Sequence, residues 1–126
     1  MRKAIAVFGL LLLLASCSDK KKLTDNIQGT WYIYKLVRYN VDLTNVLSDS
    51  LYNYRVTYSG SNYVENNVVY GDTTASSGTW EFRDNYESLA MIDTAKKERV
   101  FTIFNLTGNH VELRRNSESR YMRKVQ

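Results

Sequence analysis

Residues whose types could do chemistry are few in this chain, and they are scattered. His110 is the only histidine and Cys17 the only cysteine, so the chain holds neither a pair of imidazoles nor an internal disulfide bond. The sequence has no Gly-x-Ser-x-Gly motif, no phosphate-binding loop and no cluster with the spacing of metal ligands. We therefore expect no enzyme activity, no metal and no cofactor, and we expect His110 to be exposed or structural. The acidic residues stand singly, as Glu65, Glu81, Glu87 and Glu112.

Cys17 is the residue whose chemistry the sequence specifies best. It ends an uncharged apolar stretch, residues 4–15, that follows a short basic segment. The stretch is too short to span a bilayer and is typical of a secretory signal. The alternatives are a signal peptide with an unrelated cysteine at its end, or a short membrane helix. The arrangement resembles the bacterial lipobox, whose cysteine thiolate accepts a diacylglyceryl group. The three residues before the cysteine are Leu14, Ala15 and Ser16.

The lipobox reading divides the chain into a signal peptide (1–16), an acylated cysteine with its tether (17–26) and one domain (27–126). Two or more acyl chains make a stable anchor, so the expected partner is a membrane, reached through the N-terminal lipid. Ser18 rather than aspartate follows the cysteine, which favours the periplasmic face of the outer membrane. Without the signal, fifteen basic residues face thirteen acidic ones, so we expect no nucleic-acid partner. We also expect a monomer.

Short runs of alternating polar and apolar residues fill the rest of the chain. Turn residues separate them, such as Gly60 and the pair Asp84-Asn85. This pattern predicts an all-β fold, a small up-and-down barrel of eight antiparallel strands, with a two-sheet sandwich as the alternative. Residues 40–50 are the longest gap and could hold a short helix or a lid over the mouth. The expected strands are 29–39, 51–58, 62–70, 77–83, 86–92, 98–106, 110–115 and 119–125.

Three sequence segments resemble the lipocalin-like lipoproteins of Bacteroidota. They are Ile27-Gln28-Gly29-Thr30-Trp31, Gly78-Thr79-Trp80-Glu81-Phe82 and Phe101-Thr102-Ile103-Phe104-Asn105-Leu106-Thr107. The resemblance implies a lipocalin-like (calycin) barrel in which Trp31 closes one end against an arginine of the last strand. Arg120 and Arg123 are the candidates for that contact, and strand parity leaves the choice between them open.

Tyrosines and tryptophans are the candidates for ligand contacts. Within residues 51–58, Tyr52, Tyr54 and Tyr58 alternate with polar residues that include Arg55, so we expect the tyrosines to face inward together with Trp80. The same rings could instead fill the core. We expect a mostly packed interior with a shallow cleft near the mouth.

Two functions are compatible with these features. The first is a lipid-anchored protein that binds a small, partly apolar molecule in the cell envelope. The second is a protein-interaction module, an inhibitor or an accessory subunit of an envelope complex, with basic C-terminal strands facing an acidic partner. The basic residues in question are Arg114, Arg115, Arg120, Arg123 and Lys124.

Three Asp-Ser/Thr sites resemble the O-glycosylation sequon of Bacteroidota. Each lies where we expect a loop or a strand end, so a glycan there would stand clear of the core. The candidate acceptors are Ser50, Thr73 and Thr94.

Overall fold

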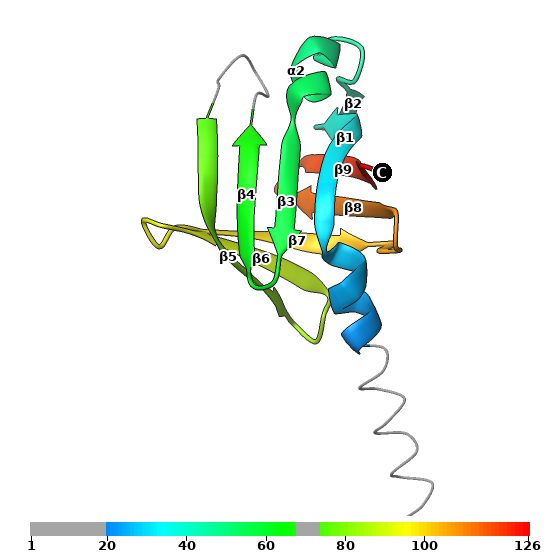
Figure 1. Cartoon of the computed structure of the whole chain (residues 1–126). Helices are drawn as coiled ribbons and strands as arrows, with labels where there is room; N and C mark the ends of the chain where they lie inside the picture. The colour runs from blue at the N-terminus through cyan, green and yellow to red at the C-terminus, as the bar shows by residue number, and fades with distance from the viewer. Residues whose placement is uncertain (1–19, 68–73) are drawn as a thin grey trace, which may run out of the picture.

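Tight turns join most consecutive strands, and each turn leads to antiparallel pairing with the next strand (Figure 1). The computed structural model describes residues 20–67 and 74–126. Turn residues adopt the left-handed conformation that the sequence predicts, as at Gly60 (φ 60°), Asp84 (φ 54°) and Asn85 (φ 56°). The elements are β1 (Gly29–Arg38), β2 (Val41–Asp42), α2 (Ser48–Asn53), β3 (Arg55–Ser59), β4 (Asn62–Asn67), β5 (Thr74–Arg83), β6 (Ser88–Asp93), β7 (Glu98–Phe104), β8 (His110–Arg115) and β9 (Glu118–Lys124).

Pairing between the first and last strands closes the sheet. β1 pairs with β9 from Trp31↔Lys124 to Arg38↔Glu118, so β1 and β3–β9 form a ring of eight strands. The two-residue strand β2 pairs only with the last two residues of β1, Val37 and Arg38. This closure confirms the predicted eight-stranded antiparallel barrel and excludes the two-sheet sandwich.

The junction between β1 and β3 is short. The two strands pair only from Gly29↔Tyr58 to Trp31↔Val56. A β-bulge between Ile33 and Lys35 then bends β1, so that Leu36 rather than Val37 is buried. Helix α2 lies beside the widening gap and buries Leu51 there.

The predicted strand over residues 51–58 is therefore wrong in its first half. Residues 51–53 end α2, and β3 begins only at Arg55. The predicted short helix exists, but it starts at Ser48, near the end of the 40–50 gap. The physical reason is that Leu51 is buried by packing of the helix against β1. The alternation of polar and apolar residues does not reveal this tertiary contact.

Side chains of the inner faces fill the barrel. The residues of the core are 0–7% exposed, and the larger ones include Trp31, Tyr54, Tyr58, Tyr63, Trp80, Leu89, Met91, Phe101 and Met122. Gly78 permits close packing within the sheet itself, because a Cβ atom there would lie 1.9 Å from the carbonyl oxygen of Ile92. The close approach of β5 and β6 thus requires a glycine at this position of the Gly78–Phe82 segment.

A helix covers one end of the barrel. Residues 20–27 are helical and lie against this closed end, although residues 17–26 were expected to be a tether (Figure 1). Ile27 is fully buried, and its carbonyl oxygen accepts a hydrogen bond of 2.9 Å from Nε1 of Trp31. Among the described residues, no helix has the length and apolar character needed to cross a bilayer.

Candidate functional site

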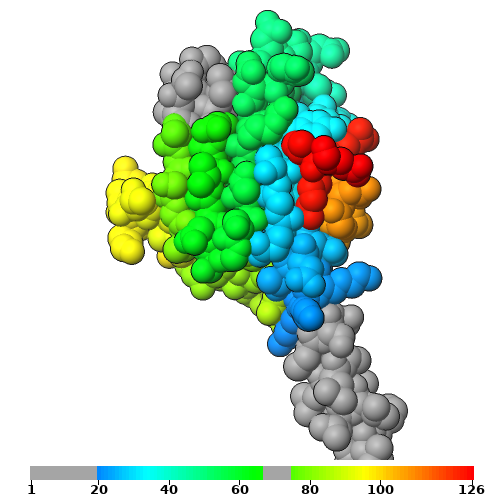
Figure 2. All heavy atoms as spheres, viewed as in Figure 1, coloured from blue at the N-terminus to red at the C-terminus, as the bar shows by residue number. Residues whose placement is uncertain are grey.

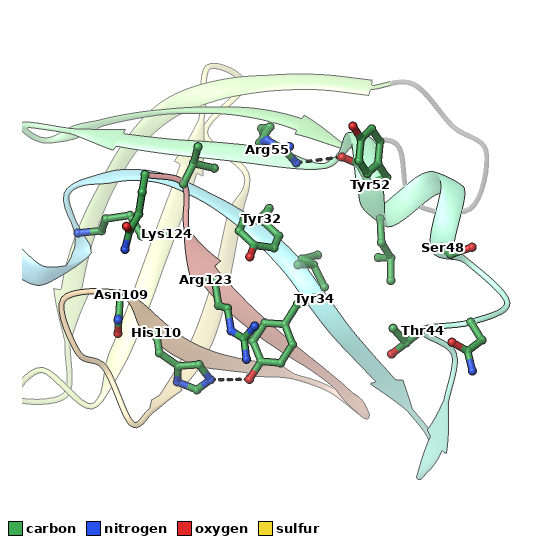
Figure 3. A pocket seen from close by; sticks show the side chains of 15 residues that line it. Tyr32, Tyr34, Thr44, Ser48, Tyr52, Arg55, Asn109, His110, Arg123 and Lys124 are labelled. Carbon is green, nitrogen blue, oxygen red and sulfur yellow. Dashed lines mark hydrogen bonds between the residues drawn. The ribbon is translucent and has the colours of Figure 1, made fainter.

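A groove formed by the described residues lies on the outside of the barrel. This groove encloses about 720 Å³ between α2 and the exposed faces of β1, β9 and the start of β8 (Figure 3). It reaches inward at the gap between β1 and β3, where the buried residues Ile33 and Leu51 form an apolar floor. In the space-filling view, the C-terminal residues lie at the surface beside β1 (Figure 2). The volume is within the range of small-molecule pockets, roughly 300–1,000 Å³.

Aromatic and cationic side chains form the long wall of the groove. Strand register places Tyr32, Arg123 and His110 in one row across β1, β9 and β8. The guanidinium carbon of Arg123 lies 4.1 Å from the ring centroid of Tyr34. The hydroxyl of Tyr34 is 2.7 Å from Nε2 of His110, a hydrogen bond whose donor depends on the histidine tautomer (Figure 3). His110 is therefore structural, as expected, and fixes one ring of this wall.

Arg55 forms the opposite rim. Its Nη1 donates hydrogen bonds to the carbonyl oxygens of Tyr52 (3.0 Å) and Tyr54 (2.6 Å). Its guanidinium carbon lies 5.6 Å from the ring centroid of Tyr32. Among the described residues lining the groove there is no aspartate or glutamate, so its charged side chains are all basic.

A second polar cluster lies inside the barrel at the mouth, the end opposite the helix of residues 20–27. The carboxylate of Glu65 accepts hydrogen bonds from the hydroxyl of Tyr54 (2.6 Å) and from Nη2 of Arg99 (2.8 Å). Nη1 of Arg120 lies 3.6 Å from the same carboxylate, and its Nε donates to Glu118 at 2.8 Å. We call these five residues the mouth cluster. They link β4, β7 and β9 across the interior with every charge compensated.

The pKa values of the mouth cluster follow from burial and pairing. Burial alone would raise the pKa of Glu65, but Arg99, together with the hydrogen bonds from Arg99 and Tyr54, holds it below the ordinary value of a glutamate. Burial, and then the negative charge of Glu65, raise the pKa of Tyr54 well above that of a free tyrosine. Glu65 is therefore ionised and Tyr54 neutral at pH 7, which makes this a locked structural network.

The candidate ligand residues separate into two groups. Tyr54, Tyr58 and Trp80 face the interior as predicted, and the rings of Tyr58 and Trp80 meet edge to face with centroids 5.8 Å apart. Tyr52 does not join them. It is 78% exposed because it lies on α2 rather than on a strand, and it lines the outer groove instead.

The closing contact of Trp31 differs from the one that the resemblance implied. Trp31 is fully buried, but the cation over its ring is Lys124, whose Nζ lies 5.1 Å from the centroid. Lys124 also donates from Nζ to the carbonyl oxygen of Asn26 at 2.8 Å. The parity of β9 explains the correction. Arg120 faces inward at the other end of the barrel, and Arg123 faces outward over Tyr34.

The basic residues of the C-terminal strands do not share one face. Arg120 lies inside the barrel with 12% of its side chain exposed, and Lys124 covers Trp31. Arg114 pairs with Glu112 at 2.9 Å, and Arg123 belongs to the groove. Alternation sends Arg120 and Arg123 to opposite sides of β9, so these two cations do not belong to one basic face.

The predicted modification sites are only partly described. Leu14, Ala15, Ser16, Cys17 and Thr73 lie outside the described residues. Thr94 is exposed in the turn after β6, which agrees with the expected loop or strand end. Ser50 lies within α2 and is half-buried, so its expected position in a loop or at a strand end is wrong.

Sequence reasoning missed the groove itself. The alternation of Tyr32, Ile33 and Tyr34 carries a usable signal, because an inward isoleucine sends both tyrosines to the outer face. Arg123 and His110 could not be added from sequence, because their proximity depends on the register of three strands. Among the described residues, no group of histidine, cysteine, aspartate and glutamate is arranged to hold a metal ion.

Comparison with known proteins agrees with this architecture. Residues 27–113 match the family described as lipocalin-like domain. A lipocalin-like protein from Bacteroides uniformis ATCC 8492 superposes with a TM-score of 0.59 at 11% identity, over 79% of this chain and 99% of that one. An uncharacterized protein from Bacteroides eggerthii DSM 20697 gives 0.58 at 11% identity with the same coverage. No curated protein matches the sequence significantly.

Proposed function

Because this chain belongs to the family of lipocalin-like domains, we propose that it is a binding protein without catalytic activity for a small, partly apolar molecule. A fold of this kind hosts many functions, so the function has to be argued from the site. The observation that carries the proposal is the position of the groove. The interior is filled by buried rings, whereas about 720 Å³ on the outside has an apolar floor and a polar rim.

The lipid anchor is the second part of the proposal. The apolar stretch that ends at Cys17 supports acylation at this cysteine, and with it a location in the cell envelope on the periplasmic face of the outer membrane. The helix of residues 20–27 starts three positions after Cys17, so the closed end of the barrel is the end nearest the lipid. The groove wall and α2 would then remain accessible to molecules in the envelope.

Titration with N-phenyl-1-naphthylamine, a neutral fluorescent probe, tests the binding function. The mature chain from Ser18 contains every described residue and is the protein to use. We expect one probe per chain. In ¹⁵N-labelled protein, the amide shifts should change at Tyr32, Tyr34, Leu51 and His110. Shifts concentrated at interior positions such as Tyr58 and Phe101, or no binding at all, would contradict the proposed site.

Two tyrosines provide a matched pair of variants. Tyr32 lines the groove, whereas Tyr39 is 71% exposed and does not. Tyr32→Ala should weaken binding of the probe several-fold, because it removes an aromatic contact of about 1 kcal/mol. Tyr39→Ala should leave binding unchanged. Equal effects of the two substitutions would indicate nonspecific adsorption of the probe.

A further inference from the structure

We propose that the ligand of the groove is an anion, a molecule with an apolar or aromatic body and one carboxylate-type group that binds the guanidinium of Arg123. This inference rests on the proposed function, since it specifies the chemistry of what the same groove binds. It is carried by the charges, the partners and the geometry of the described residues that line the groove.

The charged side chains of the lining are of one sign. Arg55, Arg123 and Lys124 line the groove together with His110, and no described lining residue is acidic. Most other arginines of the barrel form ion pairs with carboxylates. Carboxylates lie within 2.9 Å of Arg83, Arg99, Arg114 and Arg120. The groove thus gathers cations without the acids that accompany them elsewhere.

Arg123 is the member of this set that is available to a ligand. Nη1 of Arg55 already donates hydrogen bonds to two carbonyl oxygens. Nζ of Lys124 donates to the carbonyl oxygen of Asn26 at the closed end. The guanidinium of Arg123 makes no hydrogen bond or ion pair with the described residues, and its one aromatic contact is the ring of Tyr34. Its planar fork of N–H donors matches the two oxygens of a carboxylate or sulfonate.

The ring beneath Arg123 is itself held in place. The hydroxyl of Tyr34 bonds to His110, and its ring meets Tyr121 edge to face with centroids 6.3 Å apart. Stacking on a fixed ring restricts the guanidinium before a ligand arrives, so less conformational entropy is lost on binding. His110 and Tyr121 thus hold the ring of Tyr34 in the wall of the groove.

The rest of the groove fits an apolar body. Tyr32 stands between the rims of Arg55 and Arg123, and Ile33 and Leu51 form the floor below. An anion at Arg123 would therefore place its body against Tyr32 and over the β1–β3 gap. A ligand with charge at one end and an apolar skeleton at the other satisfies both halves of the groove.

Two probes with one skeleton test this inference. 8-Anilinonaphthalene-1-sulfonate carries a sulfonate that N-phenyl-1-naphthylamine lacks. We expect the sulfonate to bind the mature chain more tightly and to compete with the neutral probe for one site per chain. Raising the salt concentration should weaken only the sulfonate, because exposed charges are screened.

Substitution of Arg123 provides the decisive variant. Arg123→Gln should lower the affinity for the sulfonate about tenfold, the scale of one charge-assisted hydrogen bond, and change that for the neutral probe less than about twofold. Arg123→Lys should restore part of the loss. Arg115→Gln is the matched control, because Arg115 is exposed on the neighbouring strand and lies outside the groove. Unchanged thermal midpoints verify that all three variants are folded.

The outcomes separate the two proposals. If neither probe binds, the proposed function itself is wrong. If both bind but Arg123→Gln weakens both equally, or weakens neither, the groove is a binding site and the anionic ligand is wrong. An equal loss in Arg115→Gln also overturns the inference, because net charge rather than a placed guanidinium would then explain the preference.

Discussion

Arg99 and Glu65 meet inside the barrel mouth with Nη2 and Oε1 2.8 Å apart, although they come from β7 and β4, which are not neighbours in the sheet. The glutamate side chain is 2% exposed and that of the arginine 23%. An ion pair so placed contributes little net stability by its presence, but its disruption leaves a buried charge without a partner.

Glu65→Gln is therefore expected to lower the free energy of unfolding by about 3 kcal/mol at neutral pH. The pKa of Glu65 is lowered in the folded chain, so its contribution is complete above the ordinary glutamate pKa of about 4.3 and is lost as the pH falls below it. Urea unfolding between pH 7 and pH 3 measures both effects. Glu81→Gln is the control, since its partner Arg83 is at the surface, where an ion pair contributes little to stability. Equal losses in the two variants would mean that the mouth cluster has no special role.

Trp31→Ala is expected to cost about 3–5 kcal/mol, because a fully buried indole leaves a cavity and the hydrogen bond to Ile27 is lost. A double-mutant cycle tests which cation covers the ring. Trp31 and Lys124 should show a coupling of about 0.5–2 kcal/mol, whereas Trp31 and Arg123 should show none. Coupling to Arg123 instead would contradict the observed parity of β9.

Two glycine substitutions should lower the stability by different amounts, for separate reasons. Gly78→Ala forces a Cβ into the backbone of Ile92, so we expect a loss of about 3 kcal/mol or no folded protein. Gly60→Ala meets no atom within 4 Å and only strains a positive φ, at about 1–2 kcal/mol. Thermal unfolding of both variants measures the difference. A mild effect at Gly78 would show that β5 and β6 can separate without cost.

Cys17→Ala should abolish acylation and leave unprocessed or soluble protein, because the thiolate is the group that accepts the lipid. Incorporation of labelled fatty acid in cells producing the wild type and the variant provides the measurement. Label that still enters the alanine variant would show that another residue is modified.

The candidate glycosylation sites differ in their exposure. Thr94 is exposed in a turn, whereas Ser50 is half-buried in α2. Protein from its native host should carry extra mass that Thr94→Ala removes and Ser50→Ala does not. An intact mass equal to polypeptide plus lipid would rule out glycosylation at all three positions.

Local sequence patterns predicted the features that depend on neighbouring residues, namely strand alternation and turns. Alternation placed Tyr54 and Tyr58 inside, and left-handed turn residues located the hairpin at Asp84. Tyr52 was misplaced because α2 forms only when Leu51 finds a surface on β1 to cover. The inward direction of Arg120 depends on a carboxylate from β4 that compensates its charge, so no reading of β9 alone could supply it. The groove needs the register of three strands and the bulge in β1 together.

The short seam between β1 and β3 has one more consequence. Three register pairs hold it, whereas β1 and β9 pair along nearly their whole length. Beyond Trp31, the side of β1 that faces β3 therefore has no partner strand until β2 pairs with Val37 and Arg38. On β1 that edge is occupied locally, since the amide of Leu36 donates to Thr44 and its carbonyl oxygen accepts from Leu43. An exposed strand edge is a template on which a foreign strand can add, and natural sheets cover such edges. The turn before α2 and the helix itself therefore act as a guard against self-association, and a substitution that unwinds them should make the barrel more prone to aggregate.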